Sequence, residues 1–126
     1  MTMAASLNAD NFLSYGLQIA GIFGWRRCKK SYNLDRFKAR FGVVPKTCKM
    51  VWTELCNFND ATIRLTRKHS PKHFLLGLRF LWTYGTEPDL GDYFGIQSAK
   101  TVGKHSKIWV RKIAALLKKK VRCSCF

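Results

Sequence analysis

The fold is decided by residues 90–120, which read LGDYFGIQSAKTVGKHSKIWVRKIAALLKKK. Leu90 and Phe94 are four positions apart, which places both on one face of a short helix. Gly95 follows, and glycine allows the sharp, left-handed turn that side chains disfavour. The apolar Ile96 is placed to pack back onto the preceding helix. This stretch therefore predicts a short helix, a glycine turn and a second, longer helix.

The longer helix is predicted to run from Ala99 to about Lys120, with Ser98 as its N-terminal cap. Residues at helical spacing are expected to face inward: Val102, Trp109, Ile113, Leu116 and Leu117. Cations at i, i+4, i+7 and i+11 form one opposite face: Lys100, Lys104, Lys107 and Arg111. A helix with such a face can enter a major groove about 12 Å wide. Thr101 and His105 are expected nearest the base edges, although His105 also suits a buried inward position.

An earlier segment repeats this plan. Asn33 is expected to cap a helix ending at Phe41, Gly42 turns the chain, and Pro45 begins a second helix that ends at Cys56. Its predicted inner face is Cys48, Val51, Trp52 and Leu55. Its predicted outer face, a second contact surface, is Lys46, Lys49, Met50 and Thr53. Tight helix contact prefers a small residue, which the later copy provides as Gly91 where this copy has Lys38. The later copy is the preferred DNA reader because its cationic face is longer.

The rest of the chain also predicts helices. A helix is expected over residues 8–23, a basic connector over 25–32 and a short basic helix over 59–65. Two further predicted helices are capped by Ser70 and Thr86. The Ser70-capped helix, Pro71 to Tyr84, is expected to bury Phe74, Leu75, Leu78, Leu81 and Trp82. No convincing strand alternation is present, so the sequence predicts an all-α, compact helical bundle.

Four segments make up the expected organisation. They are an N-terminal helix and connector (1–33), a first helix-turn-helix-like unit (34–58), a core helix with the second unit (59–122), and a disordered cysteine-containing tail (123–126).

The chain is strongly basic. Among its 126 residues are 23 Lys and Arg against 7 Asp and Glu, a formal net charge of +16. All 23 lie in three acid-poor groups, residues 26–49, 64–79 and 100–122. Patterned charge of this size favours a polyanionic partner over mere solubility.

The five cysteines follow no disulfide framework, so we expect reduced thiols and an intracellular protein. The uncharged run over residues 11–25 is too short to span a bilayer, which needs about 20 residues.

Cys56, His69 and His73 match half of a zinc finger, but Cys48 stands too far from Cys56 to complete it, so no metal is expected. No cofactor, small-molecule substrate or membrane partner is expected either. Residues 119–122, Lys-Lys-Val-Arg, are typical of a nuclear import signal and equally of a basic helix end.

Three stretches, RFKARFGVVPKTCKMVWTEL, PKHFLLGLRFLWTYGTEPDL and KTVGKHSKIWVRKIAALLKKK, resemble the N-terminal region of eukaryotic Harbinger-like DDE transposases. The resemblance spans residues 34–120. It implies a helical region that binds transposable-element DNA in the nucleus and precedes an RNase H-like nuclease domain with three metal-binding acids. This sequence ends at Phe126, where that domain would begin, and its seven acids are scattered, so we expect no catalysis.

The sequence therefore predicts a transposase-derived helix-turn-helix module that binds duplex DNA. Two alternatives stay open: a general nucleic-acid or RNA-binding basic protein, and a truncated transposase remnant with no role of its own.

Overall fold

Helices form the architecture of the described chain, which in this computed structural model comprises residues 7–66, 69–83 and 87–124, with only the backbone described at 87, 99 and 119–124. In chain order they are α1 (Ala9–Ile19), the 3-10 helix η2 (Trp25–Arg27), α2 (Lys30–Phe41), α3 (Pro45–Cys56), α4 (Pro71–Thr83), α5 (Glu87–Phe94) and α6 (Ala99–Ser124). None of the described residues forms a strand. The prediction of an all-α bundle with a long C-terminal helix is confirmed.

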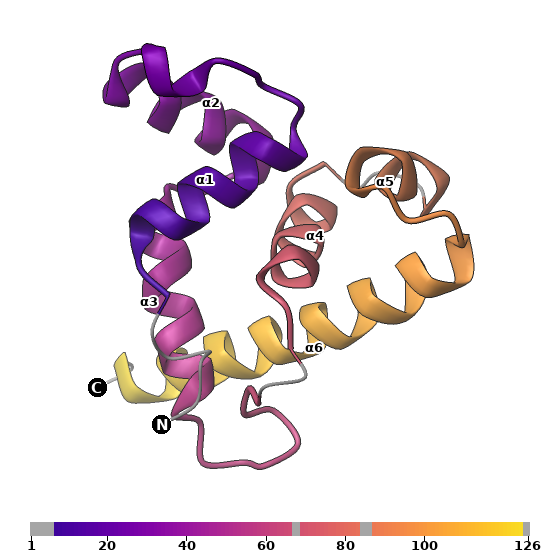
Figure 1. The fold of residues 1–126 in the computed structure, drawn as a ribbon. Helices are drawn as coiled ribbons and strands as arrows, with labels where there is room; N and C mark the ends of the chain where they lie inside the picture. The colour runs from indigo at the N-terminus through magenta and orange to yellow at the C-terminus, as the bar shows by residue number, and fades with distance from the viewer. Residues whose placement is uncertain (1–6, 67–68, 84–86, 125–126) are drawn as a thin grey trace.

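An aromatic cluster joins the two halves of the chain. The buried ring of Phe74 in α4 lies 5.5 Å from Trp52 of α3 and 5.4 Å from Trp109 of α6, measured between ring centroids. Trp52 and Trp109 stack on each other at 5.8 Å, and Phe12 of α1 lies 5.7 Å from Trp52. Figure 1 shows α4 between α1 and α3 on the left and α5 on the right, with α6 crossing below them. The buried side chains therefore form one continuous core.

Both predicted glycine turns are present. Gly42 ends α2 with φ 83° and Gly95 ends α5 with φ 69°, a backbone region that L side chains rarely adopt. Ile96 packs against the core, and its N–H donates to the Gly91 carbonyl at 2.7 Å. A Cβ on Gly91 would lie 2.6 Å from the Ile96 carbonyl oxygen, so the expected need for a small residue there is confirmed.

The start of α2 differs from the prediction. The helix begins at Lys30 with Lys29 as N-cap, and Asn33 lies inside it, only 4% exposed. The Asn33 amide donates to the Trp25 carbonyl at 2.8 Å. Asn33 as N-cap was therefore wrong, because its side chain bonds to η2 rather than to the first turn of its own helix.

The end of α1 also differs, since the helix stops at Ile19 instead of continuing to Phe23. Gly21 has φ 71°, and the N–H of Ile22 donates to the Leu17 carbonyl at 3.0 Å, which terminates the helix. Phe23, the last residue of the predicted helix, lies beyond its observed end and is 91% exposed.

Residues 59–65 form turns instead of the predicted short helix. The Asp60 carboxylate accepts hydrogen bonds from the Thr62 N–H at 2.9 Å and from its hydroxyl at 2.7 Å. The Leu65 N–H donates to the Leu55 carbonyl at 3.1 Å, which ties the segment to the end of α3. These bonds take the place of a helical ladder.

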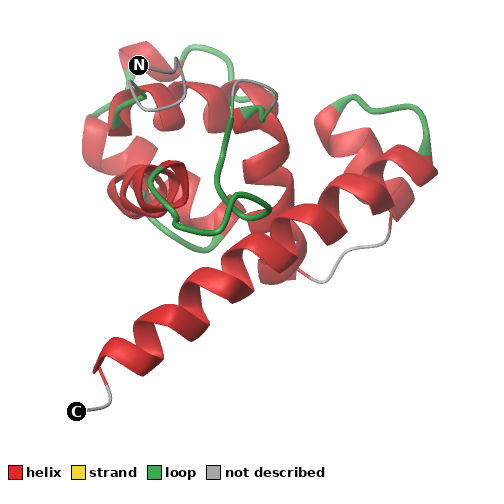
Figure 2. Ribbon diagram, turned by 90° about the horizontal axis from the view of Figure 1, so that it is seen from below, coloured by secondary structure: helices red, strands yellow, loops and turns green. Residues whose placement is uncertain are grey.

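Two residues expected in the core are exposed: Trp82 at 55% and Leu117 at 59%. Trp82 lies over the α2–α3 turn. The C-terminal end of α6 extends past the other helices, as Figure 2 shows. Tyr84 and Thr86, the predicted helix end and cap, lie outside the described residues. Ser70 and Ser98 do cap their helices, since each hydroxyl lies within hydrogen-bonding distance of an N–H in the first turn.

Candidate nucleic-acid interface

A row of exposed cations follows the outer face of α6. The four predicted ones are all exposed, and Lys118, which lies about five helical turns after Lys100, extends the row on the same face. We call this row the α6 stripe: Lys100, Lys104, Lys107, Arg111 and Lys118. At about 1.5 Å per residue it is about 27 Å long. None of its five side chains has a hydrogen-bond or ion-pair partner among the residues that the structure describes.

The core side of α6 explains why the α6 stripe faces solvent. Trp109 is buried against Trp52 of α3 and Phe74 of α4, and Val102 is buried beside Gly91 of α5. Ser106 donates its hydroxyl hydrogen to the Gly103 carbonyl at 3.1 Å. A Cβ on Gly77 of α4 would lie 2.6 Å from the Trp109 Cβ, which shows how closely the two helices approach. The burial of this side fixes the rotation of α6 and therefore directs its cations outward.

Lys112 lies beside the α6 stripe in sequence but not in space. It is 4% exposed, and its ammonium donates to the carbonyls of Thr62 at 3.1 Å and Ile63 at 2.9 Å. Burial lowers its pKa, and the nearby Asp60 carboxylate opposes this shift. Lys112 is therefore a structural residue that secures the turns after α3.

Several other cations are also engaged within the fold. Arg79 donates to the Arg40 carbonyl at 2.8 Å and lies 3.8 Å from the centroid of the Tyr93 ring. Arg36 lies 4.5 Å from the centroid of the Tyr32 ring. The positive charge of the chain is thus not equally available to a ligand, and the α6 stripe is its most regular free part.

The two residues predicted nearest the base edges lie on the flank of the α6 stripe. Thr101 is half-buried in the first turn of α6. His105 is also half-buried, and its ring stacks on His73 of α4 with a centroid distance of 3.7 Å and an interplanar angle of 7°. Burial and the charge of Lys104 lower the pKa of His105. One face of the His105 ring is therefore covered by α4.

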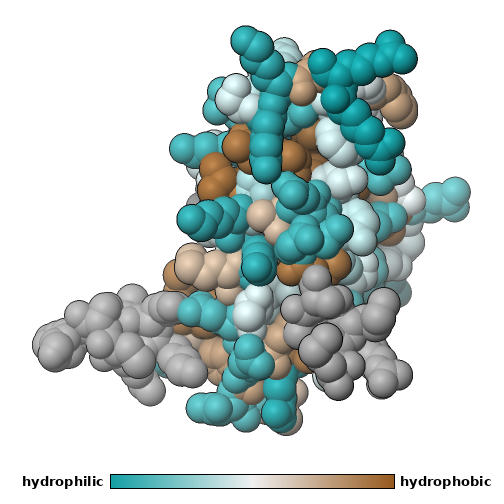
Figure 3. Space-filling view, turned by 60° about the vertical axis from the view of Figure 1, so that its left-hand side comes forward, coloured by the Kyte–Doolittle hydropathy of each residue, from teal (hydrophilic) through white to brown (hydrophobic). Residues whose placement is uncertain are grey.

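The predicted α3 surface lines a groove of about 800 Å³ against the start of α1. All four of its predicted contact residues, Lys46, Lys49, Met50 and Thr53, line this groove. Asp10 and Glu54 line it too, and Asp10 pairs with Lys30 at 3.3 Å. Figure 3 shows hydrophilic side chains projecting from this side of the molecule with hydrophobic patches between them. This surface carries acids as well as cations, unlike the α6 stripe.

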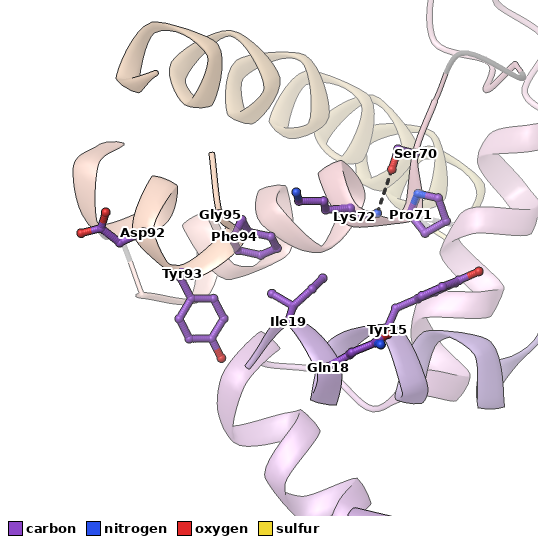
Figure 4. Close-up of a pocket in the computed structure, with 10 residues that line it drawn as sticks. All are labelled: Tyr15, Gln18, Ile19, Ser70, Pro71, Lys72, Asp92, Tyr93, Phe94 and Gly95. Carbon is purple, nitrogen blue, oxygen red and sulfur yellow. Dashed lines mark hydrogen bonds between the residues drawn. The ribbon is translucent and has the colours of Figure 1, made fainter. Parts of the chain in front are cut away.

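A second groove, of about 660 Å³, lies between α1, the start of α4 and the end of α5 (Figure 4). Lys72 extends along it, and the Lys72 N–H donates to the Ser70 hydroxyl oxygen at 3.2 Å. Asp92, its acidic lining residue, points away from Lys72 in this view. The Ser70–Lys72 contact is the hydrogen bond that Figure 4 draws between the lining residues shown there.

The half zinc-finger pattern is not assembled. Cys48 lies in the core, where burial raises its pKa to about 12, and His73 stacks on His105. Among the described residues, no three His, Cys, Asp or Glu side chains are grouped so that they could hold a metal ion. No described helix combines the length and the apolar character needed to cross a membrane.

The sequence pattern thus located the α6 stripe but missed Lys118, whose spacing of 18 residues from Lys100 is the signal that could have added it. Charge alone could not show that Lys112 differs from the neighbouring cations, which face solvent. The side chains of the 119–122 basic run lie outside the described part of the structure.

Comparison of the chain with protein-family models, with curated proteins and with solved structures finds no match. The resemblance to Harbinger-like transposases therefore stays a prediction from the sequence.

Proposed function

We propose that this protein binds duplex DNA through the α6 stripe, with α5 and α6 acting as a helix-turn-helix and without catalysis. The observation that carries the proposal is the stripe itself, five exposed cations on one helix face without a carboxylate partner among the described residues. Lysine and arginine in such a row neutralise successive phosphates and release counterions, which is the main source of affinity for duplex DNA.

Sequence preference would come from the flank of the stripe. Thr101 and His105 are the polar residues beside it, and base contacts rather than phosphate contacts discriminate sequences. Lys46, Lys49, Met50 and Thr53 would act as a second contact surface, weakened by Asp10 in the same groove.

We further propose that the module derives from a Harbinger-like transposase and acts in the nucleus. The quoted motifs and the repeated helix–glycine–helix units support this proposal. A general affinity for any nucleic acid is the alternative, because phosphates are common to DNA and RNA. Competition of labelled duplex DNA by single-stranded DNA and by RNA distinguishes the two.

The test is a titration of labelled duplex DNA at several salt concentrations. Five phosphate contacts give a slope of log K against log salt of about −4 to −5. Lys104→Ala with Lys107→Ala should reduce the steepness by about 2. The matched control is Lys38→Ala with Arg64→Ala, which removes the same charge from exposed positions outside the α6 stripe and should leave the slope nearly unchanged.

A slope near zero for the wild type would contradict the proposal. So would equal effects of the two double variants, because net charge alone would then explain binding.

A further inference from the structure

The turn between α1 and α2 exposes an aromatic ring. We call residues 21–24, Gly-Ile-Phe-Gly, the aromatic tip. Phe23 is 91% exposed, and at Gly21 and Gly24 no atom beyond the adjacent residues lies within 4 Å of where a Cβ would be. The ring therefore stands on a narrow turn with no side chain on either flanking glycine, so a planar partner can approach it.

The backbone around the aromatic tip is fixed by hydrogen bonds. On its N-terminal side the N–H groups of Gly21 and Ile22 donate to α1 carbonyls, at 3.1 and 3.0 Å. On its C-terminal side the Arg27 N–H donates to the Gly24 carbonyl at 3.1 Å, and the buried Asn33 amide holds the Trp25 carbonyl at 2.8 Å. A ring presented on an ordered backbone loses less conformational entropy on binding than one on a loose loop.

Several cations lie immediately after the aromatic tip in the sequence. Arg26, Arg27 and Lys29 are exposed, and the Arg26 guanidinium lies 5.0 Å from the centroid of the Trp25 ring. Lys30 is exposed too but pairs with Asp10 at 3.3 Å. An exposed ring beside a group of cations fits a ligand that offers both a flat apolar face and negative charge.

We propose that the aromatic tip binds single-stranded nucleic acid, with Phe23 stacking on an unpaired base while Arg26, Arg27 and Lys29 contact phosphates. Aromatic stacking with flanking cations is the usual basis of single-strand binding. Duplex bases already stack on each other, and separating a base step costs a few kcal/mol, so unpaired bases are preferred. An anionic membrane is disfavoured because Ile22 and Trp25 pack against the core, which leaves one ring to insert.

This site is separate from the α6 stripe and does not rest on it. In Figure 1 the segment between α1 and α2 lies at the top of the molecule, whereas α6 crosses the bottom. Seen from below in Figure 2, α6 runs across the near face.

The experiment is fluorescence anisotropy of a labelled oligothymidine, repeated with oligouridine, on the full chain. Phe23→Ala should weaken binding about tenfold, and Phe23→Leu nearly as much, whereas Phe23→Trp should retain it. Arg26→Ala with Arg27→Ala should lower the steepness of the salt dependence by about 1.4. Helicity by circular dichroism should be unchanged in the Phe23 variants, because this side chain is almost wholly exposed.

The α6 variant Lys104→Ala with Lys107→Ala separates this inference from the proposed function. It should retain single-strand binding, while Phe23→Ala retains duplex binding. Wild-type affinity in Phe23→Leu would overturn the inference, because leucine keeps apolar bulk without a stacking face. Absence of single-strand binding in the wild type, or its loss in the α6 variant alone, would also overturn it. So would Phe23-dependent binding to phosphatidylserine vesicles with no Phe23 dependence on oligonucleotides.

Discussion

Lys112 and Arg111 are adjacent residues with opposite environments. The Lys112 ammonium is buried and donates to two carbonyls, whereas Arg111 is exposed in the α6 stripe. Both residues belong to the basic group at residues 100–122, so charge alone does not distinguish them. Their positions around the helix do, because one faces solvent and the other faces the core. Lys112 falls three positions after Trp109, on the same inward side of α6.

Exchange of these two residues for methionine should therefore give contrasting results. Lys112→Met keeps an apolar chain of similar length but leaves the Ile63 carbonyl without its donor. We expect it to lower the free energy of unfolding by about 2 kcal/mol, while Arg111→Met changes it by less than about 0.5 kcal/mol. Urea unfolding followed by circular dichroism measures both. Equal stability of the two variants would show that the buried hydrogen bonds contribute nothing net.

In contrast to stability, DNA binding should depend on Arg111 and not on Lys112. Arg111→Met should reduce the steepness of the salt dependence by about 0.9, and Lys112→Met should leave it unchanged wherever the variant is folded.

At the level of the helices, Trp82 of α4 closes the end of α2. Its indole N–H donates to the Ala39 carbonyl at 3.1 Å, and Arg79 donates to the Arg40 carbonyl at 2.8 Å. Both carbonyls belong to the last turn of α2, where no intrahelical donor is available. A Cβ on Gly42 would lie 2.9 Å from the Trp82 ring. Trp82 thus acts as a cap from another helix, which explains its exposure.

The two glycine turns allow this contact to be measured. Gly42 and Gly95 have similar φ values, 83° and 69°, but at Gly95 no atom beyond the adjacent residues lies within 4 Å of where a Cβ would be. Gly95→Ala should cost about 1 kcal/mol for the left-handed backbone alone, and Gly42→Ala about 2 to 3 kcal/mol because the Trp82 ring must also move. In a Trp82→Ala background the cost of Gly42→Ala should fall to that of Gly95→Ala. Additive effects in this double-mutant cycle would contradict the cap.

The helix bounds that local signals predicted best are those of α3, where Pro45 occupies the first helical position. Pro45 and Cys56 were predicted as the bounds of α3 and are its bounds in the structure. Local signals gave wrong predictions where hydrogen bonds to residues distant in sequence determine the backbone conformation. Asn33 has the side chain of an N-cap, but in the structure its amide donates to the Trp25 carbonyl. Residues 59–65 were predicted to be helical, but in the structure the Lys112 ammonium donates to the carbonyls of Thr62 and Ile63.

Across the whole molecule, some features of the candidate site follow from local sequence spacing, and others depend on how distant helices pack together. Periodicity placed the cations of α6 on one face because a helix repeats every 3.6 residues whatever surrounds it. The stacking of His73 on His105 depends on how α4 lies against α6, which no spacing within either helix specifies. The exposure of Phe23 depends on the conformation of the turn after α1, whereas its apolar character alone would predict that the ring is buried.

The histidine pair between α4 and α6 makes the stability of the whole fold sensitive to acid. Burial, with smaller contributions from His105 and Lys72, lowers the pKa of His73 to about 4 from an ordinary value of about 6.5. Between these two values the unfolded chain binds a proton that the folded protein excludes, so stability falls as the pH falls from about 6.5 to about 4. Because the ring is partly exposed, we expect His73 to account for about 1 kcal/mol of this loss.

His73→Phe keeps a flat ring against His105 but cannot take a proton. Its free energy of unfolding should therefore fall less than that of the wild type between about pH 7 and pH 4.5, as measured by urea unfolding at each pH. The difference should not disappear entirely, because the pKa values of His69 and His105 are lowered as well. Measurements are kept above about pH 4.5 because the pKa of Asp60 is also lowered, by its hydrogen bonds to Thr62, and that carboxylate loses its contribution only in stronger acid. An equal loss of stability in wild type and His73→Phe would show that the stacked pair does not exclude the proton and that the acid sensitivity arises elsewhere.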